Sequence, residues 1–340
     1  MSRINVFFKD ENKKNHWQIL KEAIHFAFIK RELPKIYFGK YLYRKGIANY
    51  KDFLSTKEID KISNSKNFHK PEYAAILRNK LAFSFYTKKN YISTPMLKSY
   101  NLGNVFFFKG KQFSVADINE LGKCLNLVFE ECNINSLFIK PLADMGGTGC
   151  YLILQKNINE QLKIYGHKII KENFIHQEVV CQHPEINKIY PFSVNTIRFN
   201  TYIDKSENIN ILGSYIRFGI NGSVVDNASS GGFYVSISES GEMQEIGNQM
   251  MKYGGNIFTN HPDTGFVFAG FKIPFYNEAV ELVKEATRSL PDRIIGWDIA
   301  ITETGPMIIE GNDNNSWFGA DIAYGGYLKH PLFKEILEEA

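Results

Sequence analysis

Three oxygen-bearing side chains share one face of a predicted hairpin near the end of the chain. The segment Gly296 to Asn312 reads as two apolar strands around the turn Glu303-Thr304-Gly305, with glycine where a left-handed backbone is needed. In this register Asp298 faces Glu310, and Asn312 points to the same side because side chains alternate along a strand. Carboxylate and amide oxygens are ligands that suit magnesium. The spacing therefore predicts a magnesium site.

The same register places Thr302 opposite Pro306 and Ala300 opposite Ile308. Opposed carboxylates repel and destabilise a strand pair, and a hard cation would reverse that effect. An exposed edge hairpin with both carboxylates in water is the alternative. Four isoleucines flank the carboxylates and indicate a buried hairpin, in which two unpaired carboxylates would be costly. We therefore prefer the metal site.

A lysine and a glycine-rich segment form a second candidate group. Lys140 lies on the predicted strand 137–141, and the glycine-rich residues 144–149 lead into the predicted strand 151–155. This is no P-loop, because the GK[ST] ending is absent and a strand follows. A glycine loop between strands can still donate backbone amides to phosphates, with Lys140 adding positive charge. Taken alone, the segment is equally compatible with an ordinary loose hairpin.

The elements around these groups predict an α+β protein. Helical spacing of apolar residues marks 16–31, with Trp17, Leu20, Ile24, Ala27 and Phe28, and Pro71 opens a helix over 72–86. Strands and amphipathic helices, among them 117–131 and 275–290, alternate from residue 105 onward. Asn221-Gly222 is typical of a two-residue hairpin turn.

Composition excludes several classes. The chain has 340 residues, 44% of them hydrophobic and 22% charged, and its net charge of +4 is too small to indicate nucleic acid as a partner. Its four cysteines form no CxxC pair, so reduced thiols are expected. No signal peptide and no segment of about 20 apolar residues is visible. We expect a cytoplasmic protein without an integral membrane segment, and peripheral membrane contact stays open.

Several short phrases, in this order and spacing, resemble the ATP-grasp superfamily. The closest resemblance is to its sugar-transfer-associated group, often labelled alpha-L-glutamate-ligase-like, and it covers roughly residues 75 to 325. The first seventy residues match no phrase of it. The matching phrases are Gln177-Glu178-Val179-Val180 with Gln182-His183-Pro184, Val194 to Arg198, Val225-Asp226-Asn227 with Gly231-Gly232, His261 to Gly265, Gly296-Trp297-Asp298 and Ile309 to Asn312.

The resemblance implies an ATP-grasp fold, in which two α+β lobes enclose the nucleotide. We expect a helical N-terminal region over 1–70, an N-terminal lobe with the glycine loop over 71–175, and a C-terminal lobe with the metal site over 176–340.

It also implies roles for individual residues. ATP would contact Lys80, Lys140, Gly146, Gly147, Thr148, Gln177, Glu178, Val179, Val180 and His183. Magnesium would bind Asp298, Glu310 and Asn312. Arg198 and Lys140 would act on the reacting phosphate, and the acceptor would meet Asn195, Asp226, Asn227, Gly231 and Gly232. Arg78, Lys88 and Lys89 compete with Lys80, a surface salt bridge would explain Arg198, and an ordinary loop would explain 226–232.

The implied chemistry is an ATP- and Mg²⁺-dependent ligation. The family activates a carboxylate as an acyl-phosphate, which an amine or another nucleophile then attacks, and the family association points to cell-surface glycan or sugar-conjugate biosynthesis. The expected partners are a small carboxylate and an amine or sugar-linked acceptor. A kinase that phosphorylates a hydroxyl, and a nucleotide-binding module without turnover, are the alternatives. No dedicated general base stands out; His261 is a candidate, although its setting is equally that of a turn.

Overall fold

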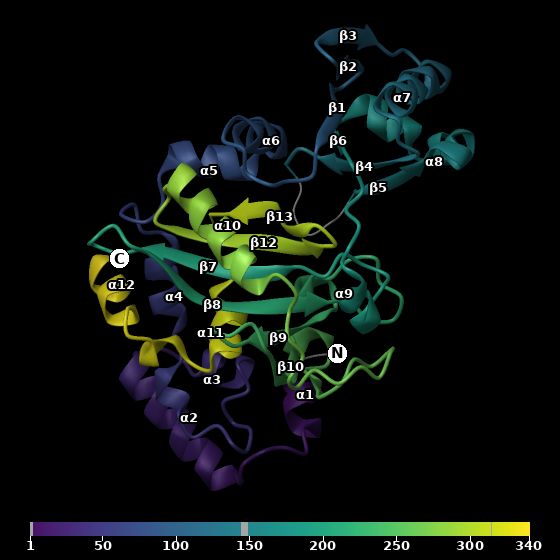
Figure 1. Cartoon of the computed structure of the whole chain (residues 1–340). Helices are drawn as coiled ribbons and strands as arrows, with labels where there is room; N and C mark the ends of the chain where they lie inside the picture. Colours follow the sequence, from purple (N-terminus) through teal and green to yellow (C-terminus); the bar gives the residue numbers. More distant parts are fainter. Residues whose placement is uncertain (1–2, 144–148, 314) are drawn as a thin grey trace.

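Two antiparallel sheets form the framework of the computed structural model, which describes residues 3–143, 149–313 and 315–340 (Figure 1). The smaller sheet has the strand order β3-β2-β1-β6-β4-β5 and the larger has β11-β10-β9-β8-β7-β12-β13. Helices cover both sheets, which confirms the expected α+β class. Among the described residues, every helix is too short or too polar to span a bilayer.

The smaller sheet packs two amphipathic helices against one of its faces. Along β4, Leu137 and Ile139 are fully buried, while α7 contributes Leu121, Leu125 and Val128 at helical spacing. Asp117 caps α7 by accepting from the backbone N–H of Glu120, so the predicted helix over 117–131 is confirmed. The elements are β1 Leu97–Leu102, β2 Val105–Phe108, β3 Lys111–Ser114, α7 Ile118–Cys132, β4 Ser136–Pro141, β5 Tyr151–Leu154, α8 Ile158–Lys171 and β6 Asn173–Gln177.

The larger sheet has a core on each face. Phe199 and Ile299 face a core completed by α10, whereas Tyr202 and Ile294 face a core completed by the C-terminal helices α11 and α12. Its elements are α9 Pro184–Ile189, β7 Ile197–Ile203, β8 Ile209–Phe218, β9 Phe233–Ile237, β10 Met243–Gln249, β11 Ile257–Phe258, α10 Tyr276–Ser289, β12 Ile294–Thr302, β13 Gly305–Asn312, α11 Trp317–Tyr324 and α12 Phe333–Glu339.

The predicted hairpin at Asn221-Gly222 is wrong. Strand β8 does pair with β9, but Phe218 lies opposite Phe233, so a loop of residues 219–232 connects them. Asn221 and Gly222 have φ angles of 55° and 72° and form a local turn inside that loop. The sequence signal identified the turn correctly and missed the length of the connection, which also contains Asp226 and Asn227.

The predicted helix over 72–86 is two helices, α5 Pro71–Arg78 and α6 Lys80–Lys89. Asn79 separates them with an extended backbone, and its side chain accepts from the N–H groups of Leu81 and Ala82, which makes it the N-cap of α6. Leu77 of α5 and Phe83 of α6 are buried in the same core as Trp297 of the larger sheet. The proposed division of the chain at residues 70 and 175 stays a prediction.

The N-terminal helices are α1 Arg3–Lys9, α2 His16–Lys30, α3 Lys35–Gly39 and α4 Thr56–Ser63, with a core of their own around Phe26 and Tyr37. A fully buried ion pair between Lys40 and Asp321 joins this region to α11. Lys40 also donates to the backbone oxygen of Leu54, and Asp321 accepts from the backbone N–H of Leu54. The pair therefore fixes the N-terminal region against a helix of the larger lobe.

Substituting Lys40 by Met should destabilise the fold by about 3–5 kcal/mol, because it leaves the Asp321 carboxylate buried without its cation. Urea denaturation measures the loss. Lys109→Met is the control, since its partner Glu131 and Lys109 itself are both exposed and their pair should matter little. Similar midpoints for the two variants would contradict a role for the buried pair.

Candidate functional site

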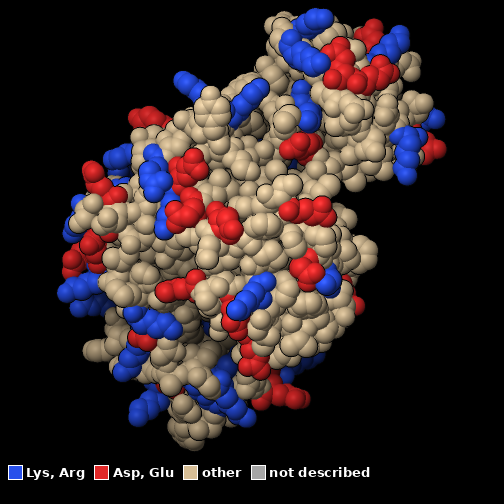
Figure 2. Space-filling model, in the orientation of Figure 1, with Lys and Arg blue, Asp and Glu red and all other residues tan. Residues whose placement is uncertain are grey.

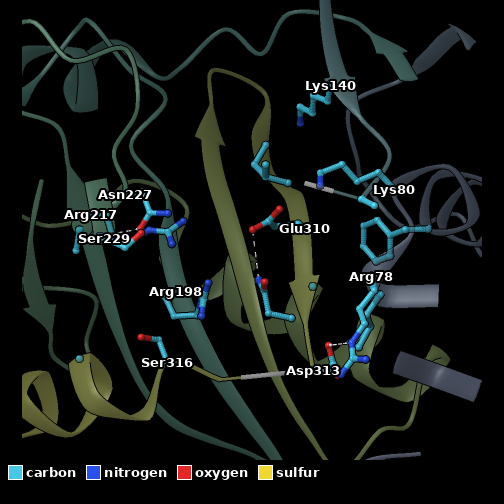
Figure 3. Close-up of a pocket in the computed structure, with 18 of the residues that line it drawn as sticks. Arg78, Lys80, Lys140, Arg198, Arg217, Asn227, Ser229, Glu310, Asp313 and Ser316 are labelled. Carbon is cyan, nitrogen blue, oxygen red and sulfur yellow. Dashed lines mark hydrogen bonds and ion pairs between the residues drawn. The ribbon is translucent and has the colours of Figure 1, made fainter. Parts of the chain in front are cut away.

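A cavity of about 590 Å³ lies between the two sheets. The smaller sheet contributes Lys140, Ile175 and Gln177 to its lining. Side chains of the larger sheet, of α5 and α6, and of the start of α11 line the rest. In Figure 3, Glu310 lies between Lys80 and Lys140 on one side and Arg198 and Arg217 on the other. The cavity thus brings basic groups from both sheets toward one carboxyl group.

A row of polar residues crosses four neighbouring strands at one level of the larger sheet. Glu310 on β13 lies opposite Asp298 on β12, Asp298 lies opposite Arg198 on β7, and Arg198 lies opposite Tyr215 on β8. Directly paired residues point to the same face of a sheet. The backbone register alone therefore stacks two carboxylates, a guanidinium and a phenol on the cavity side.

The predicted pairing of Asp298 with Glu310 is confirmed, but the predicted turn is not. Thr302 pairs with Gly305 across the two-residue connection Glu303-Thr304, so Ile299, and not Ala300, faces Ile308. Gly305 has a positive φ of 127°, as expected for a glycine at this turn. A bulge at Ile309 then adds one residue to β13 and restores the register. The shorter turn and the bulge compensate each other.

Asp298 is only 1% exposed and is held by two arginines. Arg198 donates through Nε to Oδ1 at 2.5 Å and through a terminal nitrogen to Oδ2 at 3.0 Å. A terminal nitrogen of Arg217 lies 2.9 Å from Oδ2. Burial alone would raise the pKa of Asp298, but the charges of Arg198 and Arg217 outweigh burial and hold that pKa well below its usual value. Asp298 therefore stays ionised.

Glu310 has the opposite electrostatic environment. Burial and the charge of Asp298 raise the pKa of Glu310, with Lys80 and Arg217 acting against them. Asn312 lies on the same face, and its amide nitrogen is 3.3 Å from the backbone oxygen of Gly296 and 3.5 Å from Oε1 of Glu310. Asn312 thus lies next to Glu310, as strand alternation predicts.

This donor set fits magnesium through Glu310 and Asn312. Among the described residues, no three His, Cys, Asp or Glu side chains come together as a metal-binding group. Magnesium commonly takes only one or two protein carboxylates and completes its shell with water and phosphate oxygens. Because Asp298 already accepts from two arginines, it is the least available of the three predicted ligands. The assignment of all three stays a prediction.

The two predicted phosphate lysines line the cavity together. Burial lowers the pKa of Lys140, and the negative charge of Glu310 partly opposes that shift. Lys80 reaches the cavity because the chain breaks at Asn79, which starts α6 at Lys80. The competing Lys88 and Lys89 are exposed at the other end of α6. Gly146, Gly147 and Thr148 lie outside the described residues.

The third competitor for Lys80 is also placed by this break. Arg78 ends α5 and binds Asp313 with both ends of its guanidinium group, at 3.1 Å and 2.5 Å. The Arg78 side chain is 62% exposed, whereas that of Asp313 is 8% exposed. Both residues line the cavity. Their pair connects α5 to the loop that follows the predicted metal site.

The five predicted ATP contacts between residues 177 and 183 lie where β6 leaves the smaller sheet. Gln177 lines the cavity and donates to the backbone oxygen of Pro95 at 3.0 Å. Glu178 and Met96 exchange hydrogen bonds at 3.0 Å and 2.9 Å. Val179 and Val180 follow as irregular backbone, and His183 caps α9 through its ring. The structure thus brings Gln177 to the cavity, and the lining does not include the other four.

Of the five predicted acceptor residues, Asn227 lines the cavity and the other four lie outside the cavity lining. Asn227 lines the cavity at the start of a short turn that also presents Ser229. Asp226 lies beside it and accepts from the backbone and side chain of Thr196 at 2.8 Å and 2.6 Å. Gly232 packs so tightly that a Cβ atom would lie 2.4 Å from the Phe218 oxygen, which requires glycine for structural reasons.

Two further acceptor predictions have structural contacts of their own. Gly231 adopts a left-handed conformation at the end of the 228–230 turn, and its oxygen accepts from Gln249. Asn195 is 1% exposed and binds Gln182 and the Tyr190 backbone. Neither residue is part of the cavity lining.

Sequence reasoning missed Arg217, which is as central as Arg198. Besides Asp298 it contacts Asp226 at 3.5 Å and donates to the hydroxyl of Thr196. The available signal was an arginine two residues after Tyr215 in an apolar strand, which puts both side chains on one face. Tyr234, Met250 and Ser316 complete this end of the lining, and no local pattern marked them.

Two sheets with a cavity between them, lined by lysines from one side and by carboxyl and guanidinium groups from the other, define the ATP-grasp class of fold. The chain belongs to the sugar-transfer associated ATP-grasp family, whose model matches residues 62–336. Helices α1, α2 and α3 precede the matched region, which begins near the end of α4. Among proteins of curated function, the comparison found no match to this sequence.

Solved structures with a similar fold are distant in sequence. D-alanyl-alanine synthetase A from Vibrio cholerae is 11% identical with a TM-score of 0.47, over 79% of this chain and 66% of that protein. The ATP-grasp ligase PsnB, in complex with a minimal precursor, Mg and ADP, is 12% identical with a TM-score of 0.42, over 80% and 61%. The chain thus spans about two thirds or less of the length of these proteins.

Glu310→Gln should abolish the magnesium dependence of nucleotide binding, since it removes the charge from the best-placed carboxyl ligand. In chelator at pH 8 the variant should be at least as stable as the wild type. Ionised Glu310 costs stability as pH rises through its raised pKa, and below that pKa the protonated carboxyl resembles an amide. The difference in unfolding free energy should therefore shrink as pH falls.

Thermal shifts against Mg²⁺ concentration and urea denaturation in chelator measure these effects. Glu303→Gln is the matched control, because it removes an exposed carboxylate from the turn of the same hairpin. Normal magnesium dependence in Glu310→Gln would contradict the assignment of this hairpin as the metal site.

Proposed function

We propose that the chain is an ATP-dependent ligase that joins a carboxylate to an amine or another nucleophile through an acyl-phosphate. The observation that carries the proposal is the placement of Lys80 and Lys140 across one cavity from Arg198 and Arg217, with Glu310 between them. Family membership supports nucleotide use in general. A ligase reaction would give each of these groups a role in binding the nucleotide or the substrate carboxylate.

The lysine side of the cavity suits the triphosphate. Lys140 lies on β4, which pairs with β6 and β5 in the smaller sheet, and Lys80 lies at the N-terminal end of α6, so both cations are held by regular elements. Positioned cations lower the barrier to phosphoryl transfer because charge spreads over the oxygens of the transferred group. Bound magnesium, held by Glu310 and Asn312, would neutralise further phosphate charge.

The arginine side suits the acid that receives the phosphoryl group. Asp298 holds Arg198 in a bidentate pair, while Arg217 is shared between Asp298 and Asp226 and lines the cavity beside it. In the proposed reaction a substrate carboxylate oxygen attacks the γ-phosphorus, and ADP leaves. The nucleophile then attacks the acyl carbon, and inorganic phosphate leaves with the bonding electron pair and takes up the proton that the nucleophile loses. Arg217 would orient the carboxylate and stabilise the developing charge.

Beyond the arginines, the lining changes to groups that suit a polar organic acceptor. Tyr215, Tyr234, Asn227, Ser229 and Ser316 provide hydroxyl and amide groups beside aromatic surface. Such a mixture matches a sugar-linked or amino-acid-like acceptor. The link to cell-surface glycan or sugar-conjugate biosynthesis rests on analogy with the family.

Trapping with hydroxylamine tests the reaction class. A ligase should give a hydroxamate from its carboxylate substrate, with ATP consumed in equal amount, whereas a kinase acting on a hydroxyl forms no acyl-phosphate. A panel of amino acids and sugar acids provides the candidates. ATP consumption without hydroxamate would favour the kinase, and the absence of consumption with every substrate would favour a binding module.

Mg-ATP should stabilise the fold by mass action, by about 2.7 kcal/mol at a hundredfold excess over its dissociation constant. Thermal melts with ATP and magnesium, ATP and chelator, and magnesium alone separate the contributions. An unchanged melting temperature at millimolar Mg-ATP, in protein shown to be folded, would oppose the nucleotide assignment.

Lys140→Met should weaken nucleotide binding or turnover by on the order of 2–4 kcal/mol, because it removes one positioned charge from the phosphates. Lys88→Met is the matched control, since Lys88 is exposed on α6. Titration of ATP against both variants measures the difference. Equal losses in the two variants would mean that the phosphate site lies elsewhere.

A further inference from the structure

Helix α2 has apolar residues on two opposite faces. The inner face packs Ile19, Ala23 and Phe26 into the N-terminal core, where these side chains are 5%, 7% and 0% exposed. The apolar stripe found in the sequence lies on the other face. Periodicity predicted the helix correctly, but it did not reveal which of the two apolar faces is buried.

The outer face is a continuous apolar stripe. Trp17, Leu20, Ile24 and Phe28 are 82%, 50%, 61% and 80% exposed, and their spacing of three and four residues aligns them along the helix. Single exposed apolar residues are ordinary, but a contiguous stripe that includes two large aromatic rings indicates an interaction surface.

The helix that carries this stripe is firmly anchored. Asn15 caps its N-terminus by accepting from the backbone N–H of Gln18. On the inner side, Glu22 accepts from the buried Lys14 at 2.5 Å and from the hydroxyl of Tyr37 at 2.8 Å. The outer stripe is therefore presented by a preformed helix, so its binding requires no folding step.

The exposed charged residues of the N-terminal segment that carries the stripe are mostly basic. The charged residues of segment 3–35 in the exposed class are five basic and one acidic: Arg3, Lys9, Lys21, Arg31 and Lys35 against Glu11. Lys21 follows Trp17 by four residues and precedes Ile24 by three, so it borders the stripe directly. Figure 2 shows Lys and Arg side chains beside uncharged surface at the lower end of the molecule, where Figure 1 places α2, with some Asp and Glu side chains to their right.

We propose that the outer face of α2 binds an anionic membrane surface, with the helix axis parallel to the bilayer. Aromatic and aliphatic side chains would enter the boundary between headgroups and acyl chains, while lysines and arginines contact anionic headgroups. A second copy of the chain fits less well, because a symmetric contact through this face would bring the same basic residues together. The proposal is independent of the reaction in the cavity.

Trp17 provides a local reporter of this contact. The other two tryptophans, Trp297 and Trp317, are each 1% exposed, so a change in exposed indole fluorescence reports on α2. Vesicles of phosphatidylcholine with phosphatidylglycerol should shift the emission to the blue and reduce quenching by acrylamide. Pure phosphatidylcholine vesicles should have a much smaller effect, and added salt should reverse the effect of the anionic vesicles.

Variants test the two components separately in vesicle sedimentation. Phe28→Ser should weaken binding on the order of tenfold or more, since it removes a large apolar side chain that the bilayer would bury. Lys21→Gln should weaken it about fivefold, which corresponds to about 1 kcal/mol per basic residue near the surface. Ile164→Ser and Lys163→Gln on α8 are the matched controls, because both residues are exposed far from α2 in the sequence.

Three outcomes would overturn the proposal. The first is failure to bind anionic vesicles, and the second is an equal loss of vesicle binding in the α2 and α8 variants. The third is a Trp17 blue shift that grows with protein concentration without vesicles, which would indicate self-association. An unchanged thermal shift with Mg-ATP in the α2 variants shows that they are folded. A failure of the wild type to bind Mg-ATP would contradict the proposed function and leave the vesicle result interpretable.

Discussion

The buried carboxylate of Asp298 organises the cavity side of the larger sheet. It fixes two guanidinium groups from β7 and β8 in a position where neither could be buried without a counter-charge. Removing the carboxylate would leave Arg198 and Arg217 unpaired, and removing one arginine would weaken the clamp on the other. The arrangement of this end of the cavity thus depends on one carboxylate on β12, which holds arginines from the two strands that follow it in the sheet, β7 and β8.

This clamp changes the electrostatic argument that the sequence suggested. Without other charges, repulsion between the two opposed carboxylates would affect both alike. Here the arginines lower the pKa of Asp298, whereas the pKa of Glu310 is raised. A cation is therefore most useful at Glu310, with Asn312 beside it. In this structure Asp298 pairs with two arginines, and its place in the metal shell stays a prediction.

Local signals predicted elements and faces well, because strand and helix periodicities follow directly from backbone geometry. They predicted Asp298 opposite Glu310 although the turn was one residue shorter than expected, since a bulge at Ile309 restored the register. Bulges and turn lengths depend on packing against other strands, which a single segment does not encode. The break at Asn79 was missed for a similar reason: asparagine is compatible with helix interior and cap, and tertiary contacts decide between them.

Arg217 and the outer face of α2 are two further features that the sequence pattern alone could not assign. Arg217 gained its role only when β8 was placed two strands from Asp298, and a lone arginine in a strand carries no information about that neighbour. In α2 the apolar stripe was visible, but which apolar face the core would cover depended on helices α3 and α1. Burial is a property of the assembled fold, whereas periodicity is a property of the segment.

The cavity and the outer face of α2 place opposite requirements on the fold. The cavity requires polar groups to be buried, and the pairs Asp298–Arg198 and Lys40–Asp321 show that buried charges here come with partners. The outer face of α2 requires apolar groups to be exposed, which costs solubility and is retained only with a compensating use. The neighbouring Lys21 would disfavour contact with the same face of a second copy. An anionic lipid surface satisfies both the apolar stripe and the charge, and neither requirement involves a residue of the cavity.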